Sequence, residues 1–174
     1  MTDVGTRLYS LAARLGLLLR DRRLLLATAE SCTAGGIAYA VTQIPGSSDW
    51  FDRGFVTYSN DSKQRVLGVS PVYLRDYGAV SEPVARAMAM GCLIHSAAQV
   101  AVAVTGIAGP DGGSESKPVG TVCFAWAVRR DPTTAPWVRT TTRHFDGDRA
   151  SVRTHSIVEA LEGLIQLLEQ RPDV

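Results

Sequence analysis

Apolar side chains near the start of the chain recur at helical spacing, whereas the next apolar segment is short and continuous. The helical stripe consists of Leu8, Leu11, Ala12, Leu15, Leu18 and Leu19. Spacings of three and four residues predict an amphipathic helix over residues 5–21, with one face packed on a core. Residues 24–29 are apolar without alternation, which is typical of a strand covered on both faces. The chain is therefore expected to begin with a helix followed by a buried strand.

Strands and helices are interspersed along the rest of the chain. Further strands are predicted over residues 51–59, 100–105, 121–128 and 137–145. Further helices are predicted over residues 33–43, around Lys63 between a cap at Asn60 or Asp61 and an end at Gly68, from Pro71 after a cap at Ser70, over 81–98 and over 148–169. This pattern predicts a sheet covered by helices on both faces, and the short connection between the last two strands predicts an antiparallel pair. We therefore expect a three-layer α/β/α sandwich with a mixed sheet.

Composition limits the class of protein without indicating an activity. The 174 residues suffice for a single domain, and 45% apolar with 20% charged residues is an ordinary globular composition. A net charge of +1 provides no basic field for nucleic acid. No apolar run approaches the ~20 residues that cross a bilayer. We expect a domain with neither a nucleic-acid nor a membrane partner.

The first residues and the cysteines bear on location and on metals. Residues 1–5 lack the basic start and apolar stretch of a secretory signal, which predicts a cytoplasmic protein. Cys32, Cys92 and Cys123 are widely separated and form no C-x-x-C pair, so we interpret them as reduced thiols. The three histidines show no metal-ligand spacing. No metal site is expected.

The segment after the first predicted strand is the strongest candidate for chemistry. Ser31 lies at a strand-to-helix turn, before Thr33, Ala34 and two glycines. Such a turn places a polar side chain beside amide groups without intrahelical partners, where an anion or oxyanion can bind. The alternative is that Ser31 only caps the helix and that the glycines allow close packing. The segment alone leaves both interpretations open.

A long glycine-rich loop, residues 105–120, follows a buried strand, where α/β proteins usually place ligands. It lacks the spacing of a dinucleotide fingerprint or a P-loop, so ATP binding is not supported, and a structural loop remains the alternative. If the loop binds a ligand, valine in place of Gly106 is expected to impair binding more than folding. The reason is that a β-branched side chain obstructs close backbone approach and disfavours any positive φ.

Lys63 stands out because sixteen of the 18 basic residues are arginines and the only other lysine is Lys117. A desolvated lysine can serve as a base near neutral pH, whereas arginine does not readily lose its proton. The alternative is that codon bias and chance account for the scarcity of lysine and that Lys63 has no chemical role. The position of Lys63 at a strand-to-helix junction, shortly after Tyr58, favours a role in chemistry.

Five sequence blocks in order resemble the CinA carboxy-terminal domain family of nicotinamide-nucleotide amidohydrolases over about residues 8–168. The blocks are residues 29–35, residues 54–60 with Lys63, residues 78–81, residues 105–110 with 112–113, and residues 117–122. The resemblance implies an α/β/α sandwich that hydrolyses the carboxamide of nicotinamide mononucleotide to nicotinate mononucleotide and ammonia. It also implies the stand-alone form of the family, without a cofactor, as a homodimer or larger homo-oligomer.

The resemblance further assigns roles to residues. Ser31 would be the nucleophile, Lys63 its general base and Tyr58 a proton relay or orienting group. The backbone amides of residues 32–35 would stabilise the oxyanion, and the loop over residues 105–113 would hold the nucleotide substrate. The implied substrate contacts are Cys32, Thr33, Ala34, Gly35, Asn60, Thr105, Gly106, Ile107, Ala108, Gly109 and Arg149. Ala34 stands where many members have glycine, which alanine tolerates unless the turn demands a positive φ.

Two other hypotheses remain at this point. Cys32 could be the nucleophile of an amidase, with Glu30 and Lys63 as partners. If the strand continues through Ser31 and Cys32, their side chains point to opposite sides and only one faces the pocket. Alternatively, the chain could be a nucleotide-binding regulatory module without turnover.

Overall fold

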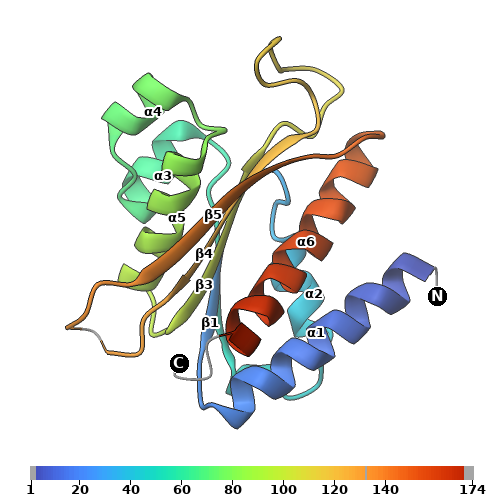
Figure 1. The fold of residues 1–174 in the computed structure, drawn as a ribbon, viewed down its shortest axis with the longest axis vertical. Coiled ribbons are helices and arrows are strands. Elements are labelled where there is room, and N and C mark those ends of the chain that lie inside the picture. Colours follow the sequence, from blue (N-terminus) through green and yellow to red (C-terminus); the bar gives the residue numbers. More distant parts are fainter. Residues whose placement is uncertain (1–2, 132, 171–174) are drawn as a thin grey trace.

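One five-stranded mixed sheet forms the centre of the protein in the computed structural model, which describes residues 3–131 and 133–170 (Figure 1). The strands are β1 (Leu26–Glu30), β2 (Phe51–Val56), β3 (Val100–Gly106), β4 (Thr121–Val128) and β5 (Trp137–His144). Their order across the sheet is β2-β1-β3-β4-β5. β1 pairs in parallel with β2 and β3, whereas β4 is antiparallel to both β3 and β5. The predicted mixed sheet and its antiparallel last pair are confirmed.

Helices cover both faces of the sheet, as Figure 1 shows. One layer contains α1 (Asp3–Asp21), α2 (Gly36–Thr42) and α6 (Arg149–Gln170), and the other contains α3 (Asn60–Leu67), α4 (Pro71–Tyr77) and α5 (Glu82–Ile94). A 3-10 turn over Ser47–Asp49 precedes β2. The three-layer α/β/α sandwich is therefore confirmed. Among the helices that the structure describes, none is long and apolar enough to cross a membrane.

The two faces of the inner strands carry side chains of different size. Valines at 100, 102 and 104 face the core under α1, α2 and α6, where they pack with Trp126 and the leucines of α6. The alternate positions Ala101 and Ala103 face the core under α5. Because alanine is small, α5 can approach the sheet closely.

Several predicted boundaries differ from the structure for local reasons. β2 ends at Val56 rather than Ser59, because Ser59 is the N-cap of α3. The Ser59 hydroxyl oxygen accepts the Ser62 N–H, and the Ser59 N–H donates to the Ser62 hydroxyl oxygen. The cap is therefore neither Asn60 nor Asp61. α2 begins at Gly36 rather than Thr33, because Ala34 and Gly35 have φ values of 51° and 91°, which no α-helix accommodates. α5 ends at Ile94 rather than 98.

The parallel strands place their carboxyl ends at one edge of the sheet, so the residues that follow them meet there. Ser31 follows β1, Thr57 and Tyr58 follow β2, and Ile107 follows β3. β5 runs in the same direction as β3, so its end leads to the start of α6 at that edge. The loop between β3 and β4 extends beyond the sheet at this end (Figure 1). The candidate site lies under this loop.

Candidate active site

A buried serine and a buried lysine form the centre of the site. The Lys63 ammonium nitrogen Nζ donates a hydrogen bond to Ser31 Oγ at 2.9 Å and another to the Thr57 carbonyl at 2.7 Å. The Lys63 side chain is 1% exposed and Ser31 is 7% exposed. The Ser31 backbone is tied to the sheet, since its N–H donates to Val104 of β3. Lys63 lies in α3, but the Thr57 carbonyl that accepts from its Nζ belongs to a residue whose N–H donates to Glu30 of β1. The two reactive groups are thus held by rigid elements.

Burial changes the proton affinity of this lysine. Loss of hydration lowers the pKa of Lys63 from 10.5 to about 8, because the charged form is costly away from water. A neutral amine can accept the Ser31 proton through its lone pair while one of its N–H groups still bonds the Thr57 carbonyl. The arrangement therefore supports a serine hydroxyl with an adjacent amine base.

The turn that carries Ser31 contains two consecutive residues in the left-handed region. Ala34 has φ 51° and Gly35 has φ 91°, and the Ala34 N–H donates to the Ser31 carbonyl at 3.0 Å. The turn therefore does demand a positive φ at Ala34, where the left-handed conformation costs alanine roughly 1–2 kcal/mol. The chain carries this local strain beside its candidate nucleophile.

Relief of that strain is a measurable effect. We expect Ala34→Gly to raise the free energy of unfolding by about 1 kcal/mol, because glycine adopts this conformation without a steric penalty. The melting temperature should rise by ~2–4 °C for a chain of this size. The control is Ala87→Gly within α5, which should lower stability because the backbone there is helical. A decrease for Ala34→Gly would contradict the strain.

A cavity of about 250 Å³ opens beside the serine and lysine. Five segments far apart in the sequence contribute its walls. Its lining residues are Ser31, Cys32, Tyr58, Lys63, Ala79, Val80, Thr105, Gly106, Ile107, Ala108, Gly109, Asp111 and Arg149. The volume is sufficient for a small planar group next to Ser31 rather than for a whole nucleotide, so the sugar and phosphate of such a ligand would lie toward the opening.

Arg149 links two sides of this cavity. Its guanidinium donates to the Gly109 carbonyl at 2.8 Å and to the Tyr58 hydroxyl at 2.9 Å. Tyr58 is 60% exposed, so this bridge lies toward solvent. Arg149 therefore places a fixed positive charge at the opening, where a phosphate group could replace one of these two partners.

Backbone amides supply further donors along the cavity wall. The Ile107 N–H donates to the Thr121 carbonyl and is not available. Within residues 3–131 and 133–170, nothing accepts a hydrogen bond from the N–H groups of Ala108 and Gly109. Because Ala108 and Gly109 both line the cavity, these N–H groups are candidate donors to a ligand. They complement the positive charge of Arg149.

Comparison with known proteins assigns the chain to a family. Residues 8–168 match the CinA C-terminal domain. This chain belongs to the CinA C-terminal domain family. It is 52% identical over 158 residues to the nicotinamide-nucleotide amidohydrolase PncC of Pseudomonas putida, a match that covers 91% of this chain and 95% of that protein. It is 48% identical over 166 residues to the protein of the same name from Escherichia coli strain K12, covering 95% and 96% respectively.

A longer relative matches over part of its length. The chain is 53% identical over 162 residues to a putative competence-damage inducible protein of Symbiobacterium thermophilum, but it covers only 38% of that protein.

Solved structures agree on the fold of the CinA domain. The competence/damage inducible protein CihA from Agrobacterium tumefaciens superposes with a TM-score of 0.85 at 46% identity, covering 92% of this chain and 95% of that one. A CinA superfamily protein from Klebsiella pneumoniae gives 0.87 at 34% identity, covering 94% and 98%.

Most of the residues predicted for the site of this CinA domain line the cavity. Those that do not are Thr33, Ala34, Gly35 and Asn60. Asn60 is exposed at the first turn of α3. Thr33 is fully buried and donates its hydroxyl hydrogen to Glu30, while the Ala34 N–H is used within the turn. Of the proposed oxyanion donors at residues 32–35, only Cys32 therefore lines the cavity.

Three lining residues were not singled out from the sequence: Ala79, Val80 and Asp111, although Asp111 lies within the predicted binding loop over residues 105–113. Ala79 is fixed at the site because its carbonyl accepts the Thr105 hydroxyl at 2.9 Å. The block over residues 78–81 carried part of the family resemblance, and that was the signal that it contributes to the site. Asp111 is the one carboxylate among the residues that line the cavity. Across the described residues, no group of three or more acidic, cysteine or histidine side chains could hold a metal ion.

Cys32 is poorly suited to be the nucleophile. Its side chain belongs to the apolar core and is 4% exposed, and burial raises the pKa of its thiol to about 12. The thiolate is therefore scarce at neutral pH. Its postulated partner Glu30 bonds neither Cys32 nor Lys63 among the described residues. The strand ends at Glu30, so Ser31 and Cys32 both reach the cavity and the expectation that only one faces it does not hold.

Gly106 is tightly packed in the fold as well as lining the cavity. It has no positive φ, and a Cβ there would lie 2.8 Å from Val122 Cγ2, 3.0 Å from the Thr121 carbonyl oxygen and 3.1 Å from Cys32 Sγ. Valine would thus overfill the core as well as the cavity. We expect Gly106→Val to lower the free energy of unfolding by ~1–3 kcal/mol, measured by urea denaturation. An unchanged urea midpoint with a raised Michaelis constant would restore the original interpretation.

Proposed function

We propose that this chain hydrolyses the carboxamide of nicotinamide mononucleotide to nicotinate mononucleotide and ammonia, with Ser31 as nucleophile and Lys63 as general base. The observation that carries the proposal is the 2.9 Å hydrogen bond between a buried serine hydroxyl and a buried lysine whose pKa is lowered to about 8. The relatives named nicotinamide-nucleotide amidohydrolase PncC support a nicotinamide nucleotide as the substrate. The chemistry needs a nucleophile and a base in contact, and the site provides both.

The first half-reaction transfers the acyl group to serine. Ser31 Oγ attacks the carboxamide carbon while its proton passes to neutral Lys63 Nζ, and the carbonyl oxygen becomes an oxyanion. Cys32 is the next residue along the chain that lines the cavity, and its N–H is the candidate donor for this oxyanion. Lys63 then gives its proton to the leaving nitrogen, so that the carbon–nitrogen bond breaks and ammonia departs. An ester of Ser31 remains.

The second half-reaction returns the enzyme to its starting state. Water attacks the ester carbonyl and gives a proton to Lys63, the bond to Ser31 Oγ breaks, and Ser31 regains the proton from Lys63. The product is the nicotinate nucleotide. The Thr57 carbonyl keeps the Lys63 amine oriented, because its 2.7 Å bond needs only one N–H of the neutral amine.

The nucleotide portion of the substrate extends toward the opening of the cavity in this proposal. Arg149 and the N–H groups of Ala108 and Gly109 bind the ribose or phosphate, and Tyr58 orients Arg149 rather than relaying protons. Tyr58 is largely exposed and bonds the guanidinium, which supports the orienting role over the relay. Thr105 shapes the wall through its bond to Ala79.

Ammonia release from nicotinamide mononucleotide by the purified chain tests the proposal. The parent should release one ammonia per nicotinate nucleotide formed, and Ser31→Ala should release none above background. Binding of the nucleotide without turnover by a folded parent would instead favour the regulatory module.

We also propose that residues 8–168 act as one domain in a cytoplasmic homodimer or larger homo-oligomer. Sedimentation velocity would test the oligomeric state, and a monomer at micromolar concentration would contradict it.

The pH dependence tests the role of Lys63. Its pKa is lowered, so the amine loses its proton at a lower pH than a free lysine, and the reactive neutral form prevails above pH ~8. We expect kcat/KM to rise about tenfold per pH unit below this midpoint and to level off above it. Steady-state rates across the pH range measure this. A profile that is flat from about pH 6 to 9 would contradict a lysine base.

A further inference from the structure

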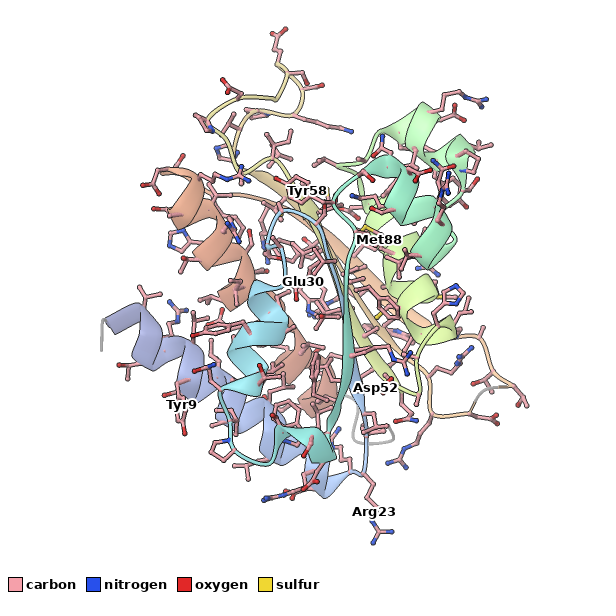
Figure 2. All side chains as sticks on the ribbon, turned by 180° about the vertical axis from the view of Figure 1, so that it is seen from behind. Tyr9, Arg23, Glu30, Asp52, Tyr58 and Met88 are labelled. Carbon is pink, nitrogen blue, oxygen red and sulfur yellow. The ribbon has the colours of Figure 1, made fainter. Side chains whose placement is uncertain are left out.

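Glu30 is a fully buried carboxylate directly before Ser31, and it takes no part in the reaction proposed above. Its side chain is 0% exposed and does not line the cavity. Figure 2 shows it beside the start of α2, toward the same end of the sheet as Tyr58. A buried carboxylate is costly unless hydrogen bonds compensate for the lost hydration. The bonds that Glu30 makes therefore indicate what it does.

Both oxygens of Glu30 are occupied by donors from three different segments. Oε1 accepts from the Thr28 hydroxyl at 3.1 Å and from the Ala38 N–H at 2.9 Å. Oε2 accepts from the Thr33 hydroxyl at 2.7 Å and from the Ile37 N–H at 3.0 Å. One carboxylate thus joins β1, the turn over residues 31–35 and the first turn of α2.

This carboxylate replaces the usual cap of α2. The N-cap residue is Gly35, which has no side chain to accept the first N–H groups, and its φ of 91° favours glycine there. Glu30 accepts those groups from the other side of the turn. Its charge also suits the positive end of the helix. The turn is thereby closed on both sides, although Ala34 within it is strained.

We infer that Glu30 is the positioning residue for Ser31: it fixes the turn over residues 31–35 so that Ser31 Oγ stays in contact with Lys63 Nζ. The expected loss of kcat rests on the proposed function, whereas the expected change in the Ser31–Lys63 contact does not. Ser31 lies between Glu30 and Thr33 in the sequence, and the Glu30 carboxylate accepts the Thr33 hydroxyl, so the chain is fixed on both sides of Ser31. Without it, the strained turn loses its closure and Ser31 moves relative to Lys63, whose Nζ is held by the Thr57 carbonyl.

Glu30→Gln is the sharpest test because it keeps the shape of the side chain and replaces one of its two accepting oxygens by an NH2 group, which donates. Each oxygen of Glu30 accepts one backbone N–H, from Ile37 or from Ala38. The amide nitrogen of glutamine must face one of these donors, and two donors cannot pair. We expect kcat to fall about 10²-fold, as a displacement near 1 Å can produce, while KM changes less than about threefold.

Glu82→Gln is a matched control. Glu82 also accepts two threonine hydroxyls, from Thr140 at 2.6 Å and Thr142 at 2.9 Å, and it also lies at the start of a helix. It does not line the cavity. We expect this variant to keep the kcat of the parent. A similar loss of kcat in both folded variants would assign the effect to general destabilisation and overturn the inference.

A crystal structure of Glu30→Gln separates this inference from the proposed function. We expect the Ser31 Oγ to Lys63 Nζ distance to exceed about 3.5 Å, beyond a hydrogen bond, whether or not the parent hydrolyses any amide. An unchanged contact in the folded variant would overturn the inference. If Glu30→Gln does not fold, Thr33→Val removes a single bond to Oε2 and should lengthen the same contact and lower kcat to a smaller degree; an unchanged contact there would count equally against it.

Discussion

Ser31→Ala should lower turnover of the nicotinamide nucleotide by at least about 10⁴-fold, because loss of a nucleophile removes the covalent route entirely. The fold should persist, since among the described residues the Ser31 side chain hydrogen-bonds only Lys63. Substrate affinity should change little, because the loop over residues 105–109 and Arg149 remain. Ammonia release and nucleotide binding by calorimetry measure the two effects separately.

Cys32→Ala is the control for that result. The Cys32 thiol is buried and protonated at neutral pH, so its removal should leave turnover within about tenfold of the parent. Alanine there leaves only a small void beside Gly106. The reverse pattern, with an inactive Cys32→Ala and an active Ser31→Ala, would transfer the nucleophile to the cysteine.

Lys63→Arg should lower turnover by roughly 10²–10⁴-fold, the usual contribution of a general base. Arginine keeps the positive charge but does not become neutral near pH 8, so it cannot accept the Ser31 proton. Nucleotide affinity should change far less, because the nucleotide is proposed to bind through Arg149 and backbone amides. Turnover within about threefold of the parent would refute the base assignment even if Ser31→Ala were inactive.

Lys117→Arg provides the matched comparison, since Lys117 is the only other lysine of the chain. Its Nζ donates to the Tyr77 carbonyl at 2.7 Å, and it does not line the cavity. An arginine can replace that single bond, so kcat should stay within about twofold. Because Lys63 is buried and arginine is bulkier, urea denaturation of both variants must show that they are folded before their rates are compared.

The hydrophobic pattern predicted the layers of this fold better than its turns. The alternation of valine and alanine in β3, the apolar run over residues 24–27 that enters β1 and the nearly continuous apolar character of β4 depend on burial, so they can be recognised without coordinates. The start of α2 could not, because it depends on the left-handed φ of Ala34 and Gly35. The cap of α3 was also misplaced, since Ser59 and Ser62 form a capping box without the glutamate that usually marks one.

The site was predicted only in part for a related reason. Ser31 and Lys63 were singled out by their local context, but their contact spans 32 positions and follows from the parallel pairing of β1 and β2 rather than from spacing. Glu30 appeared in the sequence only as a possible partner of Cys32. A charged residue at the end of an apolar strand was the available signal for its burial. Its four bonds to three segments became apparent only in the fold.

The bridge made by Arg149 ties completion of the site to the order in which the chain is made. Ser31, Lys63 and the loop over residues 105–109 precede α6, whereas Arg149 is the first residue of that helix. Leu161, Leu164 and Leu168 of α6 pack in the same core as Trp126, so the helix docks by burying its whole apolar face. During synthesis from the amino terminus, the serine and lysine can therefore meet before the opening of their cavity is complete. A nascent chain thus acquires the arginine that is proposed to bind the nucleotide only when α6 docks.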